Sequence, residues 1–388
     1  MIKKLKQIVI TGLGIFSCIC VLSCNKNTPI GPVSVTVIQP MGGHCRYSVS
    51  PATIQTLDNL QEMRGKVGRV LFSSKDLEQN PEILKTGKGL QPVDIELFKS
   101  GNTFVPANLD SLFAASLYYS VELGYLQTKR LDPNIDLAAI VPNFSDTRII
   151  HRARRVTGTN GDRSEISDNA EYYPLKTTAS NGVSTLLNYF FSYPTVNIKE
   201  IPLGLNIGIM NHEFSHLIFQ HLFYEPGIKR NMQVGESKPT SHTLAAVDEG
   251  FADYFGFLAV QDPGYFLCSF PTENRDLARP KIFTPDIVSG IESNSESNFD
   301  SHEGGAVWAA IQYEIGETLG DHQLVGKSLL KLMSNILVCS STSSNNTLNF
   351  NFADLARCHL AILSADGRAG QVAQQVYRKY LGSYGAGL

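Results

Sequence analysis

The first half of the chain alternates apolar and polar positions in short runs, a pattern typical of β-strands. Residues 33–38 alternate and are rich in β-branched side chains, so they predict a strand with one buried face. Further strands are predicted at residues 69–72, 93–97, 137–141, 147–150 and 186–193. Residues 109–126 instead repeat apolar side chains at helical spacing, which predicts one long helix among the strands. Residues 156–167 are rich in Gly, Asn, Asp and Ser and predict a loop.

The second half of the chain changes to helical periodicity. Residues 207–219 carry apolar side chains nearly all round, which indicates a buried helix. An apolar helix ending near residue 319 follows a polar loop, and further helices are predicted at residues 325–337, 352–363 and 372–381. Strands followed by helices predict an α+β fold.

The N-terminus has the composition of a bacterial export signal. A basic start precedes an apolar run at residues 8–22, which is too short to span a membrane with confidence. The run ends in Val-Leu-Ser-Cys, which resembles a lipobox. We therefore expect residues 1–23 to be a lipoprotein signal peptide, Cys24 to carry the lipid and residues 24–32 to form a tether. A plain secretory signal and a short N-terminal anchor helix remain alternatives.

This interpretation places the protein in the bacterial cell envelope, anchored to a membrane through its N-terminal lipid. Removing residues 1–23 takes away three lysines and no acidic residue, so the formal net charge moves from −3 to −6. There is no basic stripe, and nucleic-acid binding is not expected. Four of the seven cysteines remain after the signal and the anchor are set aside, an even number that permits disulfides in an oxidising compartment. They are Cys45, Cys268, Cys339 and Cys358, and the sequence does not reveal their pairing.

Candidate chemistry lies in the buried helix, which contains His-Glu-Phe-Ser-His at residues 212–216. His212 and His216 are four positions apart and share one helical face, where two imidazoles can bind one zinc ion. Glu213 follows the first histidine directly and could act as general base on a water at the same metal. A chance grouping on a surface helix is the alternative. A buried helix, however, needs partners for these polar groups.

A catalytic zinc site usually has three protein ligands and one open position. The metzincin pattern would need Gly and His where this chain has Phe219 and Leu222, so that class is excluded. Glu249 and Asp253 stand four apart on a second predicted helical face. We expect Glu249 to be the third ligand and Asp253 to hold the free ring nitrogen of a ligating histidine.

His-Glu-x-x-His followed by Glu-x-x-x-Asp resembles the gluzincin metallopeptidases, and among them the thermolysin-like enzymes. The resemblance covers the chain from about residue 168 onward. It implies that His212, His216 and Glu249 bind Zn²⁺, that Glu213 is the catalytic base and that Asp253 supports His212. The interval between His216 and Glu249 is longer than in those enzymes, and we expect the extra residues in a loop at 225–243.

The same resemblance implies a two-lobed architecture and a peptide or protein substrate. Residues 33–220 would form an α/β lobe with a mixed sheet and the active-site helix, and residues 221–388 a mainly helical lobe with the third ligand. Asn169 and Ala170 would border the cleft on an edge strand and contact the substrate, although an ordinary edge strand fits the two residues as well. His302 would stabilise the oxyanion, or would be a histidine near a helix N-cap without a catalytic role.

These expectations together predict a zinc-dependent endopeptidase that hydrolyses peptide bonds with a metal-activated water. Two alternatives stay open. One is an inactive zinc-bearing lipoprotein that binds peptide or surface material, and the other is a structural lipoprotein whose histidines serve packing. Cleavage preference, endo- or exopeptidase action, calcium binding and oligomeric state cannot be read from the sequence.

Overall fold

A computed structural model describes most of the chain. The described residues are 31–157, 164–178, 184–194, 201–229, 237–272, 275–279, 281–295, 299–339, 341–342 and 348–385. The predicted signal peptide, Cys24 and most of the tether lie outside them, so export and lipidation stay predictions. Within the described ranges, no helix has both the length and the apolar character needed to cross a membrane.

A four-stranded sheet contains the predicted strand at residues 33–38. Its order is β2 (Tyr47–Ile54), β1 (Val33–Pro40), β8 (Thr103–Pro106) and β7 (Leu97–Ser100), with β1 and β8 parallel. Val33, Val35 and Val37 are buried while their neighbours are not, as the alternation predicts. This buried face packs on α2 (Leu109–Leu131), the long helix predicted to begin at residue 109.

A larger mixed sheet forms the wall on which the candidate site rests. Its order is β12 (Ala170–Thr178), β13 (Ser184–Ser192), β9 (Arg148–His151), β5 (Gly68–Phe72), β4 (Arg64–Gly65) and β3 (Leu57–Asn59), and β6 (Gln91–Pro92) pairs with β5. The pairs β13–β9 and β5–β9 are parallel and the others are antiparallel. Strand β12 therefore stands at one end of the order, next to the helices that follow.

Three sequence predictions in this half need correction. Residues 137–141 form a short helix, α3 (Leu137–Ile140), because the Asp136 carboxylate accepts the Ala138 N–H and caps it. Residues 93–96 form no strand, since their backbone makes only scattered hydrogen bonds such as Ile95 N–H to Gln61 O at 3.0 Å. The loop predicted at residues 156–167 contains a small strand pair, β10 (Val156–Thr157) and β11 (Ser164–Glu165), around residues outside the description.

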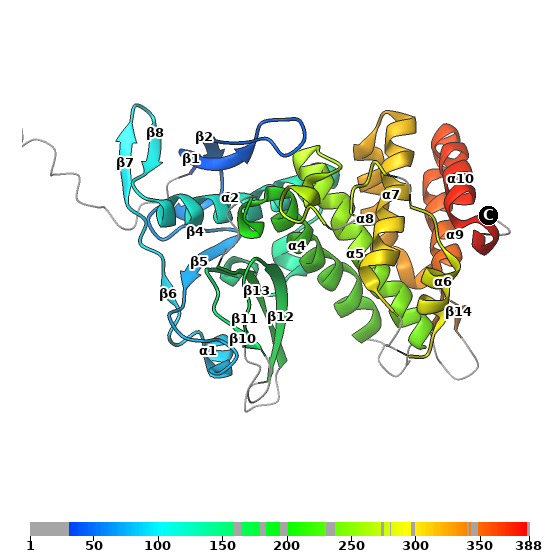
Figure 1. Ribbon diagram of the computed structural model, residues 1–388, viewed down its shortest axis with the longest axis horizontal. Coiled ribbons are helices and arrows are strands. Elements are labelled where there is room, and N and C mark those ends of the chain that lie inside the picture. The colour runs from blue at the N-terminus through cyan, green and yellow to red at the C-terminus, as the bar shows by residue number, and fades with distance from the viewer. Residues whose placement is uncertain are drawn as a thin grey trace, which may run out of the picture.

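Helices dominate the second half, as predicted, and the α+β fold is confirmed. Figure 1 shows the sheets on one side of the molecule and the later helices on the other, with α4 between them. The larger helices are α4 (Ile207–Phe219), α5 (Lys238–Val260), α6 (Pro285–Glu292), α7 (Ser301–Leu319), α8 (His322–Asn335), α9 (Phe352–Leu363) and α10 (Gly367–Leu381). Smaller elements are α1 (Pro81–Thr86), the 3₁₀ turns Phe144–Asp146, Leu203–Leu205, Tyr265–Cys268, Ile336–Cys339 and Gly382–Gly385, and the strands β14 (Ser341–Thr342) and β15 (Leu348–Asn349).

The loop predicted at residues 225–243 is shorter than expected. A π-helical segment, Gln220–Lys229, continues directly from α4. Helix α5 then begins at Lys238, because the Ser237 hydroxyl accepts the Thr240 N–H and a proline fits the first turn. Only residues 230–236 of that stretch lie outside the description.

One hydrophobic core joins the sheets to the helices. It contains side chains from α2, α4, α5 and α7, including Phe214, Phe251 and Trp308. Helix α2 reaches α4 closely at Gly124, where an added Cβ would lie 2.6 Å from the ring of Phe214. The helix carrying the two histidines is thus held from both sides by packed apolar surface.

Candidate metal centre

A buried asparagine, Asn206, caps the N-terminus of helix α4 and sets where the helix begins. The Asn206 side-chain oxygen accepts the N–H of Gly208 at 3.0 Å, which caps the first turn. Its amide group donates to Tyr265 O at 2.9 Å and to Ser269 Oγ at 3.0 Å. The cap therefore also ties the start of α4 to the segment that follows α5.

Three predicted ligands meet between α4 and α5. The Nε2 atoms of His212 and His216 lie 3.0 Å apart. Glu249 on α5 brings Oε2 to 3.5 Å from His212 Nε2 and Oε1 to 3.9 Å from His216 Nε2. These three residues could hold a metal ion.

A carboxylate stands behind each histidine. Asp253 Oδ1 lies 3.0 Å from His212 Nδ1, in the position predicted from the sequence. Asp248 Oδ1 lies 2.8 Å from His216 Nδ1, a contact that the sequence analysis missed. Because each Nδ1 faces a carboxylate, each Nε2 is left to face the other ligands. Both rings are thus oriented as a metal site requires.

The charges of the group favour a bound cation. Burial lowers the pKa of His212 to about 4, so its ring is neutral. Burial also acts to lower the pKa of His216, but the charges of Asp248 and Glu249 outweigh it and raise the pKa to about 10. Burial alone would raise the pKa of Glu249, yet the neighbouring cationic groups hold it below its ordinary value. A zinc ion that displaced the Nε2 proton of His216 would raise the net charge of this acidic group by one unit.

Glu213 lies between the ligands and the sheet. Its Oε1 is 4.0 Å from His212 Nε2, and its Oε2 accepts the backbone N–H of Tyr172 on β12 at 2.7 Å. Burial raises its pKa to about 7, against the opposing effect of His216 and of the Tyr172 hydrogen bond. A carboxyl with a pKa near neutrality, beside a metal-binding group, is suited to accept and return a proton.

The group opens into a cavity of about 400 Å³. The lining residues are Asn169, Ala170, Glu171, Tyr172, Leu203, Ile209, His212, Glu213, His216, Glu249, Phe266, Phe270, Arg275 and His302. Asn169 and Ala170 therefore lie at the cavity, as expected, and Ala170 is the first residue of β12. Four of the lining side chains are large and apolar, namely Leu203, Ile209, Phe266 and Phe270.

His302 reaches the rim of this cavity from α7. Its side chain is 54% exposed, and its Nε2 lies 3.5 Å from Glu249 Oε1. The cap of α7 is Asp300, whose carboxylate accepts the His302 N–H at 2.8 Å and lies 3.2 Å from its Nδ1. His302 is thus near the N-cap without being the cap, and its Nε2 faces Glu249 of the candidate ligand group.

Arg275 is the second residue that sequence reasoning missed. Its side chain is 7% exposed and its guanidinium binds both oxygens of Asp253, with Nε 3.2 Å from Oδ2. Its Nη2 lies 3.2 Å from Glu249 Oε2, and its Cζ lies 3.9 Å above the Phe266 ring. No motif surrounds it in the sequence. The only available signal was that several buried carboxylates require a buried cation.

Comparison with known proteins gives no relative from which a function could be inferred. The chemistry of the donor atoms and the fold around them are the grounds on which a function can be proposed. No protein-family model matches the chain, and no match is found among curated proteins.

Proposed function

We propose that the protein is a zinc-dependent peptidase of the thermolysin-like gluzincin type. The observation that carries the proposal is the placement of Glu213, a buried carboxyl with a pKa of about 7 next to a His, His, Glu ligand group at a cavity. Two imidazoles and one carboxylate are the donor set of many catalytic zinc sites, which keep a fourth position open. The Glu249 and Asp253 contacts support the resemblance seen in the sequence.

The residues around the cavity suit hydrolysis of an amide. Zinc, when bound by His212, His216 and Glu249, lowers the pKa of a water and polarises a carbonyl. Glu213 accepts the proton of the attacking water and returns it to the leaving amine. His302, at the rim, donates a hydrogen bond to the carbonyl oxygen as negative charge develops there.

The edge strand beside the cavity supports an extended peptide as the substrate. Strand β12 is an edge strand of its sheet, and its first residues line the cavity. Peptides can add to such an edge through main-chain hydrogen bonds. Four large apolar side chains among the lining residues, Leu203, Ile209, Phe266 and Phe270, could contact an apolar side chain next to the cleaved bond. We therefore propose cleavage beside apolar residues.

Replacing Glu213 by glutamine tests the proposal. An amide cannot accept the proton of the water, so Glu213→Gln should keep one zinc per chain and lose at least about 10²-fold in peptide hydrolysis. Casein and a peptide library provide the activity readout, and elemental analysis provides the zinc content. Glu82→Gln, which changes an exposed glutamate far from the cavity, is the matched control and should retain full activity.

Three results would separate the alternatives. A wild-type protein without zinc contradicts the metal assignment. Zinc without hydrolysis, across the whole library, favours the inactive binding protein. Hydrolysis by Glu213→Gln within about tenfold of wild type, with zinc retained, means that another group is the base.

A further inference from the structure

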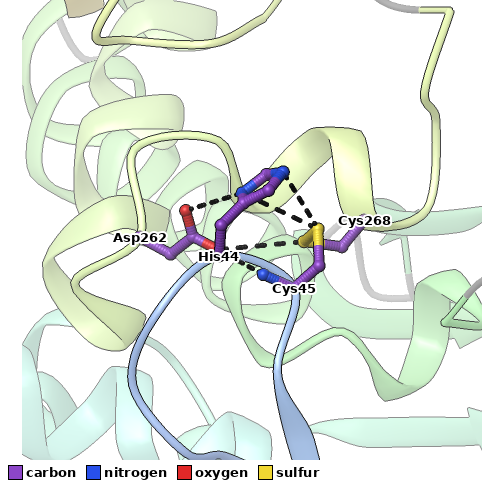
Figure 2. A group of neighbouring side chains, drawn as sticks. All are labelled: His44, Cys45, Asp262 and Cys268. Carbon is purple, nitrogen blue, oxygen red and sulfur yellow. Dashed lines mark hydrogen bonds and ion pairs between the residues drawn. A yellow bond between two sulfur atoms is a disulfide. The ribbon is translucent and has the colours of Figure 1, made fainter.

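A second group of metal-ligating side chains joins the two halves of the chain. His44 and Cys45 lie in the turn between β1 and β2, and Asp262 and Cys268 lie in the segment directly after α5. Cys45 and Cys268 form a disulfide across 223 positions of sequence. Figure 2 shows the four side chains gathered at this junction. No residue is shared with the group at His212.

The histidine of this group contacts both the carboxylate and a sulfur. Its Nδ1 lies 3.2 Å from Asp262 Oδ1, and its Nε2 lies 3.3 Å from Cys45 Sγ. Figure 2 shows the ring between the carboxylate and the sulfur. A carboxylate at one ring nitrogen fixes the tautomer and leaves the other nitrogen free to ligate. Potential donor atoms from all four residues lie within 4.8 Å of one another.

The arrangement does not depend on the disulfide alone. Asp262 Oδ2 accepts the backbone N–H of Cys45 at 3.0 Å, and Asp262 Oδ1 accepts the N–H of Gly264 at 3.0 Å. The His44 ring also packs on Gly264, where an added Cβ would lie 2.7 Å from His44 Cε1. These contacts hold His44 and Cys45 against the segment after α5 in addition to the sulfur–sulfur bond.

Opening that bond changes the chemistry of the group. A phosphine reductant takes up oxygen from one water and becomes the phosphine oxide, while the disulfide gains two electrons and two protons and becomes two thiols. Two thiolates and one imidazole are soft to borderline donors that suit Zn²⁺ or Cd²⁺. They differ in kind from the nitrogen and oxygen donors of the first group.

We propose that the reduced chain binds one zinc ion through Cys45 Sγ, Cys268 Sγ and His44 Nε2. Asp262 orients His44 through Nδ1 and holds the Cys45 backbone, and the two thiol protons leave to solvent as the metal binds. The ion then maintains the link between the β1–β2 turn and the segment after α5 that the disulfide makes in the oxidised chain.

Titration of the reduced full-length chain with Cd²⁺ tests this site. Thiolate ligands give a charge-transfer absorption in the near ultraviolet, to which the sulfur-free group at His212 cannot contribute. We use a full-length background in which Cys18, Cys20, Cys24, Cys339 and Cys358 are serine, so that only two thiols remain. After phosphine treatment, the absorption should saturate at one Cd²⁺ per chain. Without phosphine it should be absent.

Two variants decide between this site and an unspecific thiol pair. His44→Ala leaves both cysteines and should weaken Cd²⁺ binding at least about tenfold. In the serine background, Cys45→Ser/Cys268→Ser should abolish the absorption. If that background does not fold, the same pair in the natural full-length chain should lower the absorption of the reduced protein relative to the natural chain, because five other thiols remain there. Binding that is unchanged in His44→Ala, no absorption after reduction, absorption that persists in the serine background without both thiols, or undiminished absorption in the natural chain without them overturns the proposal.

Discussion

Charge balance at the level of single residues describes how the candidate metal-binding group is built. Four buried or half-buried carboxylates gather there, from Glu213, Asp248, Glu249 and Asp253. Arg275 is the one guanidinium that contacts this group among the described residues, and it binds Asp253 and Glu249. A protonated His216 is the second cation of the group and pairs with Asp248, and a bound metal ion would take the place of its Nε2 proton. The two Nε2 atoms and Glu249 offer the position for it.

His302 is the residue whose role is most open to measurement. A group that meets charge only as it develops in the transition state affects kcat more than KM. His302→Ala should therefore keep zinc and fold while kcat falls about 10²-fold, a typical cost of removing one such donor. Steady-state kinetics on a peptide, together with zinc analysis, measures both. Glu303→Gln, its exposed neighbour on α7, controls for changes at the rim.

The result can point in three directions. Loss of zinc in His302→Ala would make this histidine a ligand and reopen the assignment of Glu249. An unchanged rate would mean that another residue meets the oxyanion. A fall in melting temperature with a normal rate would leave His302 a structural role only.

At the level of elements, the site depends on how closely α5 and α7 approach. A Cβ at Gly305 on α7 would lie 2.5 Å from Glu249 Cβ and 2.9 Å from Ala246 O. A Cβ at Gly250 on α5 would lie 2.5 Å from Gly305 O. The absence of side chains at these two positions therefore lets the helices touch beside the third ligand.

Filling this contact should disturb both stability and metal binding. In Gly305→Ala the new methyl group has no room, so α7 must move away from α5. We expect a loss of about 1–3 kcal/mol in the free energy of unfolding and weaker zinc binding, because Glu249 sits at the contact. Urea unfolding and zinc titration measure the two effects. Gly367→Ala on α10 is the control, since no atom lies within 4 Å of a Cβ added there. Equal effects of the two substitutions would contradict this account.

For the whole molecule, two disulfides add covalent links, one across 223 positions of sequence and one across 19. One disulfide joins Cys45 to Cys268 and the other joins Cys339 to Cys358. All four cysteines predicted to remain in the mature chain are paired. Disulfides of this kind persist in oxidising compartments, which fits the proposed export.

Lipid anchoring through Cys24 stays a prediction with a direct test. In a bacterial host, a radioactive fatty acid should label the wild-type protein and place it in the membrane fraction. Cys24→Ser should lose the label, because serine offers no thiol to the lipid-transferring enzyme. Cys20→Ser, within the predicted signal peptide, should keep it. Label that persists in Cys24→Ser would contradict the lipobox assignment.

The periodicity of the sequence determined local features, namely where the long helices lie and which side chains share a helical face. Spacing of four on a helix was enough to put His212 and His216 on one face, and the same spacing placed Glu249 relative to Asp253. Apolar periodicity also located the long helices, with α9 predicted at both ends. It failed at residues 137–141, where a capping side chain outweighed a strand-like run.

Contacts through space decided everything that joins distant segments. Asp248 and Arg275 reach the histidines only because α4, α5 and the segment after it pack together, and neither carries a motif. The Tyr172 N–H donates a hydrogen bond to Glu213 because β12 is an edge strand that lies beside α4. The pairing of Cys45 with Cys268 likewise depends on the contact between the β1–β2 turn and the segment after α5. Sequence spacing determines which side chains share a face, whereas tertiary packing alone determines what that face meets.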